Sequence, residues 1–169
     1  PQDGLFAGIT THVDGSEHHY DYIMGNPPFV GARLMSESQK SDVLSVWGNV
    51  KNIGNVDYVS CWYKKAADLM KNTTTKSALV STNSITQGEQ VAIMWKPLME
   101  SGIKINFAYR TFRWDSESTQ KAHVHCVIIG FSSTNVETNK IIFDNGKIIK
   151  ADNINPYLVP APNIYIESR

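Results

Sequence analysis

The chain has 169 residues, of which 41% are hydrophobic and 19% charged, so it can form about one domain with a real core and is not intrinsically disordered. No apolar run approaches the roughly 20 residues that a membrane-spanning helix requires, so we expect a soluble protein. Sixteen basic residues balance sixteen acidic ones, which excludes a global positive field as the means of holding a nucleic-acid backbone.

The chain starts with a polar, glycine-containing stretch, residues 1–18, that has no clear period. Residues 19–24 are aromatic and β-rich, and they stop abruptly at Gly25-Asn26-Pro27-Pro28. This pattern predicts a strand that ends in a rigid loop.

Two helices are expected next. Ser36 and Gln39 form a capping-box pattern, which predicts a helix of about three turns that ends at Gly48. In residues 56–70 the apolar positions recur at spacings of three and four, which predicts a second helix with Asn55 as its cap.

A buried strand and a further helix follow. The apolar triplet inside residues 77–81 predicts the strand. Thr86 and Glu89 form a second capping-box pattern, which predicts a helix that continues to about Ser101. Pro97 lies within that helix and should kink it or shift its hydrogen bonds locally.

The last third of the chain is rich in strands. Residues 103–109 and 123–131 have strand patterns, and we expect the two strands to be antiparallel because no covering helix separates them. Asn145-Gly146 lies between two apolar runs and predicts a hairpin. Prolines exclude a helix from residues 155–162, which we expect to be extended and interpret as part of a connector over residues 152–169. The order of the elements predicts an α/β fold with a mixed sheet.

The chemistry centres on Asn26-Pro27-Pro28-Phe29, because open α/β sheets bind their ligands at the carboxyl ends of strands. The exocyclic amine of a nucleobase is a poor nucleophile, since its lone pair is delocalised into the ring, and two acceptors facing its hydrogens return density to the nitrogen. The Asn26 side-chain oxygen can be one acceptor and the Pro27 carbonyl the other. Pro28 keeps Pro27 extended and so fixes the direction of that carbonyl.

Phe29 offers a flat apolar face to a base taken out of its duplex, an interaction worth about 1–3 kcal/mol per stacked base. The alternative interpretation is that the Asn-Pro-Pro turn merely ends a strand and that Phe29 belongs to the core. The four residues alone leave both interpretations open.

Longer stretches carry a family resemblance: residues 22–33 (YIMGNPPFVGAR), 80–90 (VSTNSITQGEQ), 109–114 (YRTFRW) and 123–131 (HVHCVIIGF). Together they resemble the methyltransferase part of MmeI-like bacterial restriction-modification proteins of type IIG/IIL, and the resemblance covers residues 20–169. It implies the C-terminal half of a Rossmann-like class I fold that uses S-adenosylmethionine. The implied reaction is methyl transfer to the exocyclic amino group of adenine in double-stranded DNA, with the adenine flipped.

The resemblance also implies roles for individual residues. The catalytic motif would be Asn26, Pro27, Pro28 and Phe29, with Asn26 and Pro27 also contacting the cofactor. Phe29 would bind the substrate base.

Three further residues are candidate substrate contacts. Asn83, after the predicted strand at 77–81, would contact the base or the cofactor, and a plain turn role is the alternative. Phe112 or Trp114, in the polar connection before the strand at 123–131, would form a second aromatic face around the base. For the two aromatic residues the alternative is ordinary packing.

Two departures from the family indicate that the chain holds only part of the catalytic domain. None of the eleven glycines forms a G-x-G pair, so the glycine-rich cofactor loop of the family is missing. No lysine has Asp or Glu two residues before it, so the signature of the family's nuclease is missing too. We interpret residues 1–151 as a partial methyltransferase domain, inactive alone, and residues 152–169 as a connector towards a target-recognition domain outside the chain. The strand at 19–24 should then have a bare edge through which the chain self-associates.

Other functions and sites are weighed against this interpretation. An RNA or protein-amide methyltransferase and a non-catalytic nucleic-acid-binding module stay as alternatives. No metal site is expected at His18-His19 or at His123 and His125, because zinc needs three or four convergent ligands. Cys61 and Cys126 lack a metal or redox spacing, as is usual in the cytosol, so we expect a cytoplasmic protein.

Overall fold

The computed structural model describes residues 20–114, 124–133 and 139–166. Within these residues six strands form one sheet in the order β1-β2-β4-β3-β5-β6. The strands are β1 Tyr22–Gly25, β2 Lys76–Thr82, β3 Lys104–Trp114, β4 Val124–Ser132, β5 Lys140–Asp144 and β6 Lys147–Ala151. The helical segments are Ala32–Leu34 (3-10), α1 Glu37–Trp47, Ile53–Asn55 (3-10), α2 Ser60–Leu69, Asn83–Thr86 (3-10), α3 Gly88–Gln90, Val91–Trp95 (π) and α4 Lys96–Glu100.

The sheet is mixed, as predicted. β1 pairs in parallel with β2, and β3 in parallel with β5, whereas β4 lies antiparallel between β2 and β3. The expected antiparallel arrangement of β3 and β4 is therefore confirmed. So is the hairpin at Asn145-Gly146, which joins β5 to β6 and places both residues at positive φ.

The start of α1 follows its sequence signal. The Ser36 hydroxyl accepts a hydrogen bond from the Gln39 backbone N–H at 3.3 Å, and the Gln39 side chain accepts one from the Ser36 backbone N–H at 2.9 Å. The helix ends at Gly48, whose φ of 64° suits glycine and whose N–H donates to the Leu44 carbonyl. The predicted capping box and helix end are confirmed.

The predicted second helix starts later than expected. α2 begins at Ser60, and Asn55 closes a short 3-10 turn instead of capping the helix. Long-range hydrogen bonds hold the residues before Ser60 outside the helix, because the Tyr58 N–H donates to the Val30 carbonyl at 2.9 Å. Periodicity alone placed this boundary wrongly.

The third helix also departs from its predicted start. Thr86 does not cap it, since its hydroxyl donates to the Asn83 carbonyl at 2.8 Å within the 3-10 turn, and the helix starts at Gly88. The expected effect of Pro97 is confirmed, because the backbone over Val91–Trp95 is a π-helix directly before α4. Pro97 has no N–H to give to a regular ladder, and the wider turn ahead of it accommodates that loss.

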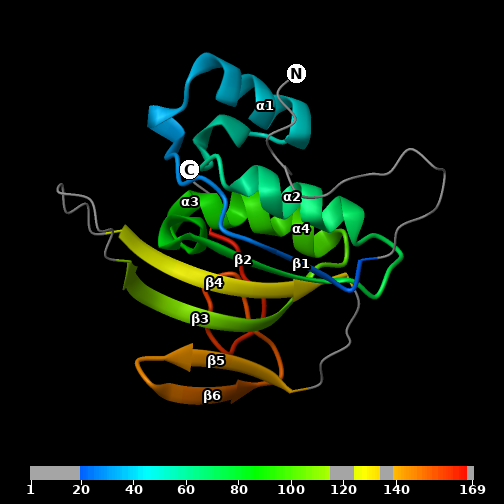
Figure 1. Cartoon of the computed structure of the whole chain (residues 1–169), viewed down its shortest axis with the longest axis vertical. Coiled ribbons are helices and arrows are strands. Elements are labelled where there is room, and N and C mark those ends of the chain that lie inside the picture. The colour runs from blue at the N-terminus through cyan, green and yellow to red at the C-terminus, as the bar shows by residue number, and fades with distance from the viewer. Residues whose placement is uncertain (1–19, 115–123, 134–138, 167–169) are drawn as a thin grey trace.

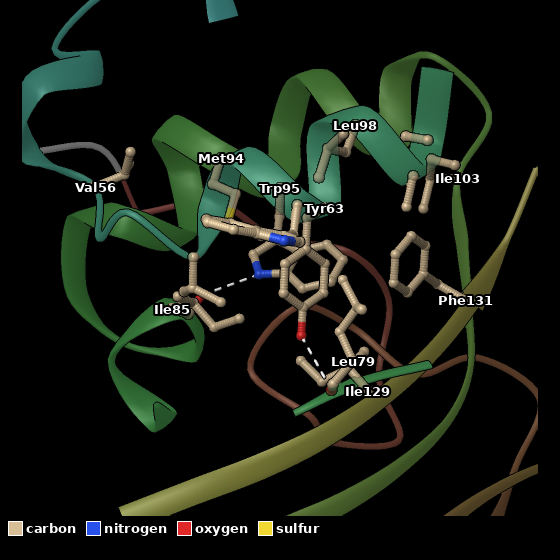
Figure 2. Close-up of a cluster of buried hydrophobic side chains, with 14 of the residues drawn as sticks. Val56, Tyr63, Leu79, Ile85, Met94, Trp95, Leu98, Ile103, Ile129 and Phe131 are labelled. Carbon is tan, nitrogen blue, oxygen red and sulfur yellow. Dashed lines mark hydrogen bonds between the residues drawn. The ribbon is translucent and has the colours of Figure 1, made fainter. Parts of the chain in front are cut away.

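The main core lies between the helices and one face of the sheet, and α1 to α4 all lie on that side (Figure 1). The Tyr63 ring stacks on Phe131 at 5.1 Å between centroids and meets Trp95 edge-on at 5.4 Å (Figure 2). The Tyr63 hydroxyl hydrogen-bonds the Ser81 hydroxyl at 2.8 Å, so its polar atom has a partner. No helix in the described part of the chain is long and apolar enough to cross a bilayer.

The opposite face of the sheet is apolar and partly open. Tyr22 and Met24 on β1 are 66% and 78% exposed. Phe107 lies directly over Gly130, where an added Cβ would come within 2.1 Å of the Phe107 ring, so only glycine permits this approach. The Tyr109 ring stacks on the ring of Phe143, in β5, on this face of the sheet.

The segment after β6 has no helix, as predicted, but it turns and packs instead of staying extended. Ile154 and Leu158 are buried in the core cluster. The Asn155 side-chain oxygen accepts hydrogen bonds from the backbone N–H groups of Tyr157 and Val159 at 3.0 and 3.3 Å, which closes the turn.

Candidate active site

The Asn-Pro-Pro-Phe corner follows directly on the last residue of β1. Asn26 and Pro28 are exposed, Pro27 is buried and Phe29 is half-buried. The Asn26 amide takes no part in the hydrogen bonds among the described residues, and neither does the Pro27 carbonyl. Both oxygen acceptors are therefore without an internal partner in this part of the chain.

The end of β2 lies beside this corner. Because β1 and β2 are parallel, with Gly25 opposite Leu79, their carboxyl ends meet at the same edge of the sheet. Asn83 follows β2 and is half-buried at the start of the 3-10 turn. The structure thus places Asn26 and Asn83 at one edge, as their positions after predicted strands suggested.

A buried carboxylate, which sequence reasoning missed, lies between the two strand ends. Asp57 is 7% exposed, and its side chain accepts hydrogen bonds from four neutral donors. These donors are the Ala32 N–H at 3.1 Å, the Gln90 Nε2 at 3.2 Å, the Thr82 hydroxyl at 3.3 Å and the Ser84 hydroxyl. One feature of the sequence could have pointed to Asp57: it is the single charged residue inside the apolar run at residues 56–59. The helical period there predicted only a helix.

Phe112 and Trp114 are not in a connecting loop as expected. Both belong to β3, which continues to Trp114 because its pairing with β4 resumes after a register shift that follows Tyr109, with Phe112 opposite Cys126. Phe112 is half-buried and packs edge-on against Tyr109 at 5.4 Å. β3 ends at the same edge of the sheet as β2, since Cys126 also pairs with Thr82. The Trp114 side chain lies outside the described part of the chain.

Comparison with known proteins identifies the fold and its family. The family model described as MmeI, DNA-methyltransferase domain, matches residues 7–144. The chain belongs to the MmeI DNA-methyltransferase family.

Two similar proteins are much longer than this chain. It is 43% identical over 157 residues to DNA methyltransferase A of Bacillus subtilis (strain 168), which covers 93% of the chain and 18% of that protein. It also matches the solved structure of the Type IIL restriction-modification enzyme MmeI in complex with DNA, with a TM-score of 0.81 and 48% identity over 88% of this chain and 21% of that one. The chain spans about a fifth of the length of these relatives, and the predicted Rossmann-like methyltransferase fold class is confirmed.

The two cysteines and the possible metal ligands do not indicate a thiol-based or metal-based reaction. Burial raises the pKa of the Cys126 thiol, and burial together with the nearby Asp42 carboxylate raises that of Cys61 to about 12. Both thiols stay protonated near neutral pH, so neither is a ready nucleophile. No three metal-ligating side chains converge among the described residues, and His18, His19 and His123 lie outside them.

Proposed function

We propose that this chain is the part of an adenine-specific DNA methyltransferase that holds the target amine, within a bacterial restriction-modification protein. The observation that carries the proposal is the exposed Asn26 amide in an Asn-Pro-Pro-Phe corner at the end of β1, in a member of the MmeI methyltransferase family. The related MmeI structure contains DNA, which supports duplex DNA as the partner. We also propose a cytoplasmic location, because bacterial DNA lies in the cytoplasm.

The corner residues have distinct tasks in this reaction. The Asn26 side-chain oxygen and the Pro27 carbonyl accept hydrogen bonds from the two N–H groups of the adenine amine, which returns electron density to the nitrogen. Pro28 keeps the Pro27 carbonyl in position, and Phe29 stacks on the flipped base. Holding the amine in this orientation would lower the barrier to methyl transfer, in which an N–C bond forms as the S–C bond of the donor breaks and the nitrogen then loses a proton to solvent.

The methyl donor that this proposal requires is S-adenosylmethionine. S-adenosylmethionine, when bound, supplies an electrophilic methyl group on its sulfonium. Asn26 and Pro27 are the residues that would contact it, since they follow directly on the carboxyl end of β1, where open α/β sheets bind their ligands. Because none of the eleven glycines forms a G-x-G pair, we expect the isolated chain to be inactive.

The substrate class is testable with a labelled methyl donor. The full-length protein is expected to transfer label to duplex DNA, recovered as N6-methyladenine after digestion. RNA and bulk protein, offered at the same concentration, serve as the competing substrates. Label in RNA or in a protein amide, with none in DNA, would assign the motif to one of those substrates instead.

We also propose that residues 1–151 are the catalytic part and that residues 152–169 lead towards a target-recognition domain. Self-association of the chain through β1 forms part of this proposal. β1 is one of the two edge strands of the described sheet, and its Tyr22 and Met24 side chains are exposed. An open, apolar strand edge favours pairing with a second copy.

Light scattering tests this self-association. The chain is expected to form dimers or larger species as its concentration rises, and Met24→Lys is expected to shift the equilibrium towards monomer because a charge on an edge strand opposes pairing. Leu44→Lys, at a 57% exposed position on α1, is the matched control. A wild-type chain that stays monomeric at high concentration would refute the interface.

A further inference from the structure

We propose that Asp57 is a positioning residue that sets the Asn-Pro-Pro-Phe corner against the end of β2. The inference rests on the proposed function, because the corner must be the place where the amine is held. Asp57 is remote from the motif in sequence and comes between α1 and α2, on the segment that does not become helical.

The two oxygens of the Asp57 carboxylate accept hydrogen bonds from two different segments, one that follows β1 and one at the end of β2. Oδ1 accepts from the Ala32 N–H, three residues after Phe29, at 3.1 Å. Oδ2 accepts from the hydroxyls of Thr82 and Ser84, which flank Asn83. One side chain thus joins the loop that continues the corner to the loop that carries Asn83.

Neighbouring hydrogen bonds make this junction rigid. The Asp57 N–H donates to the Gln90 Oε1 at 3.0 Å while the Gln90 amide donates back to Oδ1 at 3.2 Å, so the two residues form a reciprocal pair. The Tyr58 N–H donates to the Val30 carbonyl at 2.9 Å, one residue after Phe29. The segment therefore holds the corner from two consecutive residues, and α3 holds the segment.

A packing role does not account for a carboxylate at this place. Burial of a charge is costly, and no Lys or Arg among the described residues forms an ion pair with Asp57. Hydrogen bonds from neutral donors offset this cost, and a carboxylate offers about four acceptor sites, enough for the four donors present. An apolar side chain would fill the space but would leave the Ala32 N–H and the Gln90 amide without acceptors.

Two substitutions of Asp57 in the full-length protein test the role. Asp57→Ala removes every acceptor and is expected to lower kcat by about 100-fold, the effect of a small misplacement of reacting groups, with little change in KM or in DNA affinity. Asp57→Asn is expected to retain kcat within about threefold, since its oxygen can face Ala32 and its amide can donate to the two hydroxyls, which also accept. A merely structural role would make activity follow the folded fraction in both variants.

Asp68→Ala is the control, because Asp68 is also a carboxylate but, among the described residues, its side chain binds only Lys64, within α2, and it contacts neither the corner nor the segment that holds it. It should keep kcat. Equal losses of kcat in the Asp68 and Asp57 alanine variants, or wild-type kcat in folded Asp57→Ala, would overturn the inference.

Two milder variants apply if Asp57→Ala does not fold. Ser84→Ala and Thr82→Val each remove one donor to Oδ2, and each is expected to lower kcat by about fivefold, the equivalent of one ordinary hydrogen bond. Unchanged kcat in both would overturn the inference. Asn26→Ala, measured alongside, separates the two ideas: retained methylation there refutes the proposed function, whereas its loss with normal Asp57 variants refutes only the role of Asp57.

Discussion

Replacement of Asn26 by alanine in the full-length protein is expected to lower the methylation rate by about 100- to 1,000-fold, the usual cost of removing one preorganised polar group that acts on the reacting atoms. The side chain is exposed and makes no hydrogen bond among the described residues, so the fold does not depend on it. Stability and DNA binding should therefore stay at wild-type values. Turnover with a labelled methyl donor, a DNA-binding titration and thermal unfolding provide the three readouts.

Asn49→Ala is the matched control for this substitution. Asn49 is another exposed asparagine and lies in the bend after α1. Its replacement should leave turnover unchanged. A wild-type rate in Asn26→Ala would mean that the Asn-Pro-Pro turn only ends β1, which is the alternative that the tetrapeptide itself left open.

Features that depend on a few adjacent residues could be predicted from the sequence. The Ser36–Gln39 capping box joins atoms three residues apart, and the Asn145-Gly146 turn needs only two residues that tolerate positive φ. Pro97 disturbs the helix through its own missing N–H. In each case the cause and the effect lie within one turn of the backbone, so tertiary structure hardly alters the outcome.

Features set by partners far along the chain could not be predicted. The late start of α2 follows from hydrogen bonds of residues 57 and 58 to residues 30 and 90, which periodicity does not contain. β3 extends through Phe112 to Trp114 because β4 supplies a ladder for those residues. A polar stretch with no period therefore became a strand, and two aromatic residues moved from a loop to the sheet.

The candidate site also has a part that could be predicted from the sequence and a part that could not. The Asn26–Phe29 corner was predictable because its prolines act locally, and the parallel pairing of β1 with β2 explains why Asn83 shares its edge. Asp57 was not predictable, since its donors come from residues 25 to 33 positions away. A site residue that acts by joining distant loops has no short motif to reveal it.

The largest effect on stability is expected from Trp95→Ala. Trp95 is fully buried at the end of the π-helix, where its ring packs edge-on against Tyr63 and its Nε1 donates to the Ile85 carbonyl at 2.9 Å (Figure 2). Its removal should reduce the free energy of unfolding by about 3–5 kcal/mol, the usual cost of truncating a buried tryptophan. Urea denaturation of the chain measures the change, and Leu44→Ala, at an exposed position on α1, should stay within about 0.5 kcal/mol of wild type.

Trp95→Phe distinguishes the cavity from the hydrogen bond. Phenylalanine keeps most of the apolar contact with Tyr63 but leaves the buried Ile85 carbonyl unpaired, which should cost about 1–3 kcal/mol. Because Ile85 lies in the turn that also carries Asn83, this bond ties the helix layer to the candidate site. Trp95→Phe should therefore lower methylation by the full-length protein at temperatures where the variant is still folded, and a loss of stability with no loss of rate would show that the turn keeps its shape without the indole.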